Sequence, residues 1–473
     1  MSNLTFPPLS AELRSNRLLD LLKLFGPGAI IASVTIGSGE TLFSSRGGAI
    51  FEYAIAWCFV FGLLMKGVQV YTSTRYITLT GEHPMAYWAF LPGPRAWFPI
   101  CFGAMTLISF PFFLSSLPVM LGSLAQWVVG VGSPQVWGTF FVLLAILVTF
   151  IQSYSTLERV QTFIVGILLV GILIAAVVSN PSWLDLIQGV LVPVIPEYAT
   201  WVQTSYPAIA ARPSWVEVMT YLGVIGGGTQ DYIGYVGMLR EKGWGRLGIQ
   251  NNDEGARTTA THVPIPLSEH PDDVRTGLAW LKAPFTDTVV SFTAVLIFAI
   301  AFMILGATVL HQQQLIPDGF ELLSLQAQFL TQFHPLLLYV YQIGIFTAFF
   351  GTILGAYELY TRTTYECLRP ISPVFRQMPL RKIRVWVVTY TGIVGLVLIW
   401  TGWNPISLIT PVSILTGVFM CGIWCFVMIW TDRRFLPAPY RMGRGLMSMN
   451  VLAGTAMCLF GLKAIIDYVS GMF

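Results

Sequence analysis

The stretch "ASVTIGSGETLFSS", residues 32–45, lies inside the first long apolar run of the chain. Its centre, residues 37–40, reads Gly-Ser-Gly-Glu where an uninterrupted membrane helix would carry apolar side chains. Glycine weakens a helix, and a carboxylate at the centre of a bilayer costs roughly 2.5–3.5 kcal/mol on insertion scales. The pattern therefore predicts a membrane helix that unwinds at this point, with Glu40 facing a cavity near the midplane.

The composition is that of a membrane protein. The 473 residues are 55% hydrophobic and only 10% charged, with a mean hydropathy of +0.69. Apolar runs of about 20 residues, the length that crosses a bilayer, number about eleven. They are residues 25–51, 53–79, 96–122, 134–153, 157–179, 216–240, 284–310, 335–361, 384–402, 405–431 and 446–469. We expect an all-α polytopic membrane protein with about 11 transmembrane helices.

The basic residues predict the orientation. With the N-terminus in the cytoplasm, 22 of the 26 Lys and Arg residues fall on cytoplasmic segments, as the positive-inside rule requires. We therefore expect a multi-pass protein of the cell membrane, with a cytoplasmic N-terminus and an extracellular or periplasmic C-terminus.

A second cluster of small and polar residues lies five spans after the first. Span 6 reads "YLGVIGGGTQDYIGYVG" over residues 221–237, and its glycines also lead to an acid, Asp231. Because five is an odd number, the second set of five spans would enter the membrane inverted. Glycine-interrupted segments at matching positions of two halves point to a transporter site at the midplane. We predict two inverted repeats of five helices, with helices 1 and 6 broken.

This organisation divides the chain as follows. The predicted segments are a cytoplasmic arm (1–24), the first five-helix repeat (25–180), an extracellular loop (181–215), the second repeat (216–431, with an irregular cytoplasmic loop at 241–282), and a linker with helix 11 (432–473).

The charges inside the spans need partners. If the two breaks face each other, Glu40 and Asp231 repel, by about 3 kcal/mol at 5 Å and an effective dielectric of 20. A bound cation, a proton or a basic side chain would relieve that repulsion. Lys66, near the middle of span 2, is either a coupling group or counter-ion for one of the acids, or a side chain that snorkels to the interface. Asp287 and Glu358 have structural explanations, at the start of a helix and in an i, i+4 pair with an arginine.

Several segments resemble the Nramp divalent-metal transporters. They are "GPG" at 26–28, "TSTRYITLTGE" at the end of span 2, "LERVQTFIVGILLVGILIAAVVSNPSW" through span 5, "TDTVVSF" in span 7 and "NPISLITPVSILTGVFM" in span 10. The resemblance covers nearly the whole chain in order and implies a LeuT-type fold of five-plus-five inverted repeats.

The resemblance fails at the site. Counted without gaps from Gly28, the family's Asp-Pro-Gly-Asn metal motif falls on residues 37–40, and its Met-Pro-His motif falls on residues 230–232. The second histidine of span 6 falls on Gly237, and span 3 has no carboxylate. The metal-binding aspartate and methionine are thus both replaced. Neither the family's substrate nor its proton coupling carries over to this chain.

The donors that remain are hard oxygens, which suit Mg²⁺ or Mn²⁺. The expected substrate-binding residues are Thr35, Ile36, Gly37, Ser38, Gly39, Glu40, Gly226, Gly227, Gly228, Thr229, Gln230 and Asp231, and the expected metal ligands among them are Glu40, Asp231 and Gln230. The leading hypothesis is a secondary transporter of a hard divalent cation working by alternating access, and not an enzyme.

Two alternatives stay open. Five glycines in the two clusters remove side-chain bulk, which favours a larger solute such as a metal chelate, an organic cation or an amino-acid-like molecule. A non-transporting sensor that keeps the fold is the other alternative. The expected partners are the transported ion or solute and membrane lipid, without a cofactor, nucleic acid or obligate protein partner.

Overall fold

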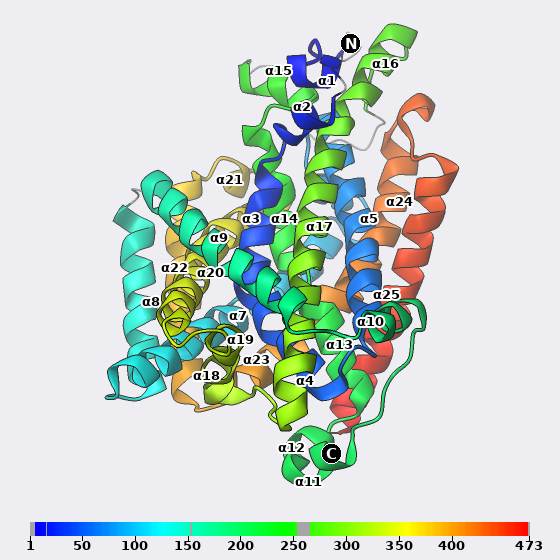
Figure 1. The fold of residues 1–473 in the computed structure, drawn as a ribbon. Coiled ribbons are helices and arrows are strands. Elements are labelled where there is room, and N and C mark those ends of the chain that lie inside the picture. The colour runs from blue at the N-terminus through cyan, green and yellow to red at the C-terminus, as the bar shows by residue number, and fades with distance from the viewer. Residues whose placement is uncertain (1–4, 16, 152–153, 253–264, 472–473) are drawn as a thin grey trace.

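The computed structural model describes residues 5–15, 17–151, 154–252 and 265–471. They form one elongated bundle of helices, and Figure 1 shows the N-terminal segment and the C-terminus at opposite ends of it. The long helices and their continuations are α3 (Pro27–Thr35), η1 (Ile36–Ser44), α4 (Ser45–Phe51), α5 (Ala56–Thr80), α7 (Trp97–Val129), α8 (Pro134–Ile151), α9 (Tyr154–Val178), α13 (Ser214–Val224), α14 (Thr229–Met238), α17 (Lys282–Leu305), η4 (Gly306–Leu310), α20 (Leu337–Leu368), α22 (Leu380–Trp400), α23 (Pro405–Val412), η7 (Ser413–Phe419), α24 (Met420–Phe435) and α25 (Arg444–Ser470).

Short helices fill the connections. They are α1 (Ala11–Ser15), α2 (Leu18–Leu22), α6 (Pro84–Trp88), α10 (Trp183–Leu191), α11 (Thr200–Ser205), α12 (Pro207–Ala210), η2 (Leu239–Glu241), α15 (Arg246–Asn252), α16 (Pro271–Trp280), η5 (His311–Gln313), η6 (Gly319–Glu321), α18 (Leu322–Gln326), α19 (Gln328–Thr331), α21 (Pro373–Arg376) and η8 (Ala438–Tyr440).

The eleven predicted spans coincide with these long helices. In the described part of the chain, seven helices are by themselves long and apolar enough to cross a membrane, or up to eight if a bent pair counts as one span. The remaining predicted spans fall below that measure for a physical reason. Span 1 contains the polar and small residues Gly-Ser-Gly-Glu, and span 6 is interrupted at its glycine cluster. Helix α5 carries Lys66, Gln69 and Arg75 inside the bundle, where all three are buried.

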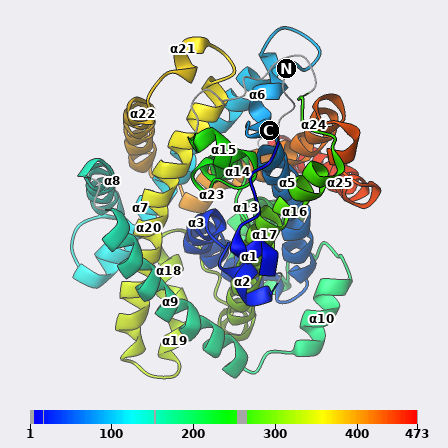
Figure 2. The same ribbon diagram turned by 90° about the horizontal axis from the view of Figure 1, so that it is seen from above.

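The helices sort into an inner and an outer group. Seen along the bundle, α3, α14 and α17 lie near the centre, whereas α8, α22 and α25 lie at the outside (Figure 2). The outer helices expose large apolar side chains, among them Leu143 on α8, Val397 on α22 and Leu459 on α25. Such a surface is unfavourable in water and suits the hydrocarbon of a bilayer. Polar residues such as Glu40, Lys66 and Asp231 are, by contrast, buried inside the bundle.

The prediction of an irregular loop at 241–282 is wrong where α15 and α16 form, while residues 253–264 lie outside the described residues. Helix α16 starts with Pro271 at its first position and carries Asp272 and Asp273 in its first turn, both favourable at a helix N-terminus. It ends at the buried Trp280, whose indole N–H donates to the carbonyl of Pro7 at 3.0 Å. The loop is therefore partly ordered by packing against the N-terminal arm.

Asp287 is structural, as predicted, but it serves a different helix. Its two carboxylate oxygens accept the backbone N–H groups of Gly26 and Gly28 at 2.8 and 2.9 Å. These N–H groups belong to the first turn of α3, which has no preceding carbonyls to accept them. Asp287 on α17 thus caps the start of α3 and places the first glycine cluster relative to the second repeat.

Candidate functional site

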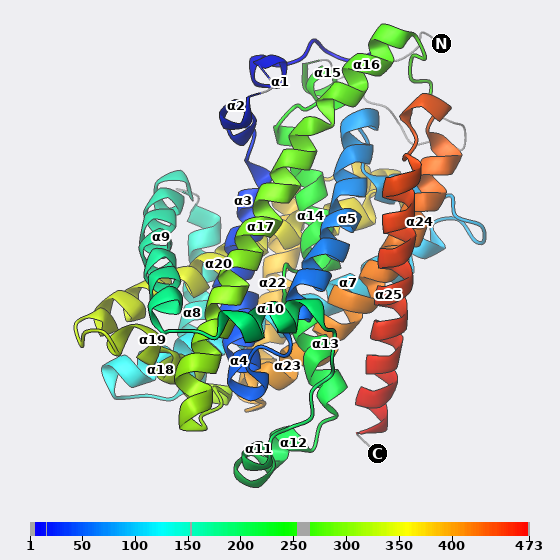
Figure 3. The same cartoon turned by 45° about the vertical axis from the view of Figure 1, so that its right-hand side comes forward.

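The second glycine cluster breaks its helix, as predicted. Helix α13 ends at Val224, and Ile225 leaves the helical conformation with φ −58° and ψ 130°. Gly226 and Gly227 follow with φ of 72° and 86°, a region open to glycine at little cost. Helix α14 then starts at Thr229. Residues 225–228, called the α13–α14 break below, lie midway along the bundle between the two half-helices (Figures 1 and 3).

The first glycine cluster does not unwind in the same way. Residues Ile36–Ser44 continue from α3 into α4 as a π-helix, a widened helical turn. The helix is therefore widened at residues 36–44 and not unwound, which differs from the prediction for this segment. Helical backbone hydrogen bonding is retained, and the Thr41 hydroxyl also donates to the carbonyl of Ile36 at 2.6 Å.

Three buried charged side chains hold the α13–α14 break. Glu40, from η1, accepts the Gly226 N–H through Oε1 at 2.8 Å. Asp231, in the first turn of α14, accepts the Gly228 N–H through Oδ2 at 2.9 Å. Lys66, from α5, donates to three backbone carbonyls, that of Gly223 at the end of α13 and those of Ile225 and Gly227 in the break. The two predicted acids thus both bind the backbone of the break, at N–H groups two residues apart, those of Gly226 and Gly228.

A small cavity adjoins the break and has a volume of about 30 Å³. Its lining combines hydroxyl, amide and carboxylate groups with apolar side chains. The lining residues are Val34, Thr35, Phe113, Leu114, Leu117, Gly223, Val224, Gly227, Gln230, Asp231, Thr352, Ala356 and Tyr360. A cavity of this size holds about one water molecule or one small ion. No cysteine or methionine is among these lining residues.

The structure brings only some of the predicted site residues to this cavity. Thr35, Gly227, Gln230 and Asp231 line it, whereas Glu40 faces the break instead. Also absent from the lining are Ile36, Gly37, Gly39, Gly226, Gly228 and Thr229. Ser38 lies in η1, but its side chain is outside the described part. Among the described residues, no group of three or more His, Cys, Asp or Glu side chains is placed to hold a metal.

Three buried oxygens at the break have no hydrogen-bond partner within the described part of the chain. They are Glu40 Oε2, Thr229 Oγ1 and Gln230 Oε1. Leaving a buried polar atom unpaired costs about 1–3 kcal/mol. Atoms of this kind mark a place where a ligand or water can supply the missing contact. All three are hard oxygen donors.

Sequence reasoning missed the part of the cavity that comes from α7 and α20. Phe113, Leu114 and Leu117 lie on α7, and Thr352 and Tyr360 lie on α20. On α20 the sequence does indicate a polar face toward the cavity, because the polar residues at 352 and 360 are eight positions apart and so lie on one side of the helix. On α7 the apolar sequence is nearly uniform, and the face toward the cavity cannot be told from the others.

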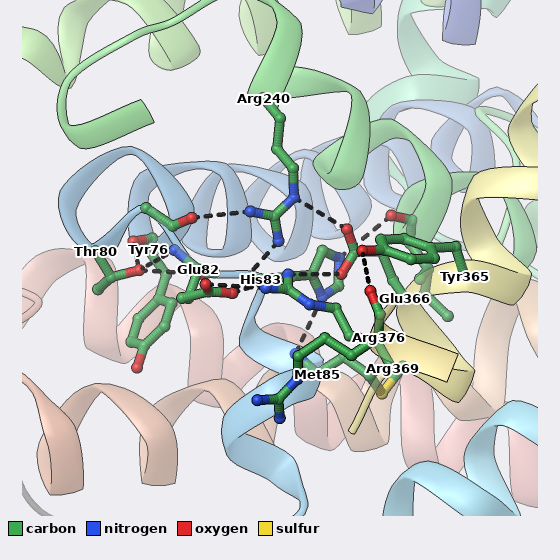
Figure 4. A network of polar contacts seen from close by, with 12 residues as sticks. Tyr76, Thr80, Glu82, His83, Met85, Arg240, Tyr365, Glu366, Arg369 and Arg376 are labelled. Atoms are coloured by element: carbon green, nitrogen blue, oxygen red, sulfur yellow. Dashed lines mark hydrogen bonds and ion pairs between the residues drawn. The ribbon is translucent and has the colours of Figure 1, made fainter. Parts of the chain in front are cut away.

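Ion pairs connect the two predicted repeats at both ends of the break. At the end near α15, Arg240 and Arg369 contact the carboxylates of Glu82 and Glu366 (Figure 4). Burial lowers the pKa of the adjoining His83 to about 4, so this imidazole is neutral near pH 7. Because buried charges are costly when separated from their partners, this network holds α5, η2 and α20 together.

A second buried cluster lies toward the other end of the bundle. The Arg46 guanidinium on α4 contacts Glu217 on α13 and Asp318, each at 2.7 Å. Arg46 also donates to the carbonyl of Pro317 at 3.2 Å. The α13–α14 break therefore lies between two ion-pair clusters that each join the first repeat to the second.

The sequence as a whole matches one family model. Residues 28–467 match the model described as natural resistance-associated macrophage protein-like, or Nramp. The chain belongs to the Nramp family. No curated protein matches its sequence. The match spans the helices that build the site.

Solved structures share the fold at low sequence identity. The manganese transporter of Eremococcus coleocola, in complex with an aromatic bis-isothiourea compound, matches with a TM-score of 0.64 and 13% identity, covering 100% of this chain and 91% of that one. The inward-facing conformation of Mhp1 matches with a TM-score of 0.50 and 14% identity, covering 95% of this chain and 91% of that one. MhsT in complex with L-phenylalanine matches with a TM-score of 0.50 and 12% identity, covering 93% of this chain and 98% of that one. The chain therefore has the fold shared by these three solved structures.

Proposed function

We propose that this Nramp protein transports a small, hard divalent cation of the Mg²⁺ or Mn²⁺ class by alternating access. The observation that carries the proposal is the cavity beside the α13–α14 break, with its size of about 30 Å³ and its oxygen donors. Thr35, Gln230 and Asp231 offer a hydroxyl, an amide and a carboxylate, and no sulfur lines the cavity. Mg²⁺ and Mn²⁺ prefer such donors, and Mg²⁺ commonly binds through one or two carboxylates while keeping several waters.

The packing of the glycines favours a small ion over a larger solute. A Cβ on Gly37 would lie 2.1 Å from Thr352 Oγ1, and one on Gly39 would lie 2.7 Å from Val224. The space beside these glycines is thus filled by neighbouring helices. Because glycine has no side chain, the neighbouring helices approach closely here, which is a common role of small residues in membrane bundles.

The ion-pair clusters support an alternating-access mechanism. Each cluster has ion pairs that join the two repeats, Arg46–Glu217 on one side of the break and those of Glu82 with Arg240 and Arg369 on the other, so separating the repeats on either side would break them. Movement of one repeat against the other around a fixed midplane site is the general scheme for proteins with inverted repeats. The Eremococcus coleocola manganese transporter shares the fold over the whole length of this chain.

Isothermal titration of the purified protein with Mg²⁺, Mn²⁺ and Ca²⁺ tests the binding site. We expect saturable binding of Mg²⁺ or Mn²⁺, weakened by about tenfold or more in Asp231→Asn, because that variant removes the charge that lines the cavity. The asparagine keeps a side-chain oxygen for the Gly228 N–H. The matched control is Asp272→Asn, which changes an exposed carboxylate on α16.

Two results would count against the proposal. One is the absence of binding of any of these ions by folded protein, and the other is an equal affinity in the wild type and Asp231→Asn. Either result would move attention to a chelated metal or an organic solute.

A further inference from the structure

The Lys66 ammonium lies at the C-terminal end of half-helix α13. Its Nζ donates to the carbonyls of Gly223, Ile225 and Gly227 at 2.9, 2.6 and 2.7 Å. An ammonium has three N–H donors, so each of these carbonyls takes one and none is left over. The side chain is completely buried. Lys66 therefore neither snorkels to an interface nor reaches an acid through its own protons.

The three carbonyls need a cation because the helix ends there. The last carbonyls of an α-helix have no following N–H groups to accept, and they carry the negative end of the helix dipole. Beyond Val224 the backbone turns away from the helix, and Ile225 and Gly227 direct their carbonyls at the same nitrogen as Gly223. A cage of backbone carbonyls results, built from one repeat and occupied by a side chain of the other.

Neither acid at the break takes part in this cage. Glu40 accepts from Gly226 and Asp231 accepts from Gly228. Within the described residues, neither carboxylate forms an ion pair with Lys66 at 4.0 Å or less. The ammonium is thus held by carbonyl oxygens alone, as a free metal ion would be.

We propose that Lys66 is a tethered cation that fills a monovalent-cation site at the α13–α14 break. In transporters with broken helices, unwound carbonyls and half-helix C-terminal ends coordinate the coupling cation. Here the ammonium supplied by α5 occupies that position, so the closed break needs neither Na⁺ nor K⁺. The inference concerns a monovalent site and holds whichever solute the neighbouring cavity binds.

Thermal unfolding in detergent, with no divalent ion present, tests the proposal. The wild type and Lys66→Ala are compared in NaCl, KCl, NH₄Cl and choline chloride at equal ionic strength, with Lys463→Ala, an exposed lysine on α25, as the control. We expect the wild type and the control to unfold at the same temperature in all four salts. Lys66→Ala should unfold earlier in choline and recover saturably in at least one small cation, by on the order of 5 °C.

Two outcomes would overturn the proposal. The first is a wild type that is itself stabilised by Na⁺ or K⁺ over choline, which requires no variant to be folded. The second is a Lys66→Ala protein that unfolds at the same temperature in all four salts. If Lys66→Ala does not fold, the first outcome still decides the proposal, because it is measured on the wild type alone. Because no divalent ion is added, failure here is separate from failure of the transport proposal.

Discussion

The two glycine clusters of this protein have nearly the same sequence signature and different structures. In the first, residues 36–44 stay helical as a π-helix, whereas the second breaks over residues 225–228. Both contain glycines followed by an acid at mid-span. Glycine content therefore does not decide where a membrane helix breaks.

The difference lies in the side chains that satisfy the exposed backbone groups of the second cluster, two of them from other helices and one from α14 itself. At the break, Glu40 accepts the Gly226 N–H, Lys66 takes three carbonyls, and the Tyr232 hydroxyl donates to the Gly226 carbonyl at 2.7 Å. Backbone freed within a membrane is tolerated only when it is satisfied in this way. The acid of the first cluster is used to hold the second cluster open. The first cluster then keeps its own hydrogen bonds within a widened helix.

Lys66→Met is expected to lower the free energy of unfolding more than any other substitution at the two clusters. The substitution removes the ammonium from the carbonyls of Gly223, Ile225 and Gly227, of which, among the described residues, only the last keeps another donor, the Tyr232 hydroxyl at 3.2 Å. We expect the free energy of unfolding in mixed micelles to fall by about 3–5 kcal/mol, the range for losing one member of a buried polar set. Lys463→Met is the control. A loss below about 1 kcal/mol would show that the break does not depend on its cation.

Two substitutions of Glu40 separate the contribution of its hydrogen bond to Gly226 from that of its negative charge. Glu40→Ala removes the acceptor of the Gly226 N–H and leaves a cavity, so we expect a loss of about 2–3 kcal/mol in the same unfolding measurement. Glu40→Gln keeps an oxygen for that N–H and should lose about 1 kcal/mol or less. Equal losses in the two variants would mean that the carboxylate charge, and not the hydrogen bond, supports the break.

Alanine at single glycines should separate backbone strain from packing. Gly226→Ala forces a side chain into positive φ, at about 1–2 kcal/mol, and adding Leu63→Ala, which removes its nearest neighbour, should not restore stability. Gly37→Ala is limited by contact with Thr352, so Thr352→Ala should restore part of its loss. Both pairs are measured as double-mutant cycles. If Leu63→Ala restored the stability lost in Gly226→Ala, and Thr352→Ala restored none of that lost in Gly37→Ala, then packing would limit the second cluster and not the first, contrary to this account.

The smallest effects concern single hydroxyls. Tyr232→Phe removes the hydrogen bond to Gly226 O, and Thr41→Val removes the one to Ile36 O. Each should lower the free energy of unfolding by about 1 kcal/mol. We expect only Tyr232→Phe to be more damaging when Lys66 is already replaced, since both groups serve the same break. Additive losses for that pair would show that the break has no shared polar network.

The sequence predicts the fold well because the helices are long and the two clusters stand out against apolar surroundings. The spans and the break at residues 225–228 follow from patterns within one segment, and the inverted repeats follow from the likeness of two such segments. The partners of Lys66 do not, since carbonyls are identical in every residue and only the three-dimensional path of the break makes them converge. For the same reason the contribution of Leu117 to the cavity was not predictable, because every face of α7 is apolar.

Uptake into proteoliposomes tests the central claim most directly, namely that a hard divalent cation crosses at the α13–α14 break. Mg²⁺ and Mn²⁺ entry would be followed for the wild type, Asp231→Asn and the exposed control Asp272→Asn. We expect saturable uptake by the wild type and the control, and a loss of about tenfold or more in Asp231→Asn. Uptake unchanged in Asp231→Asn, or no uptake of either ion by the wild type, would contradict the account.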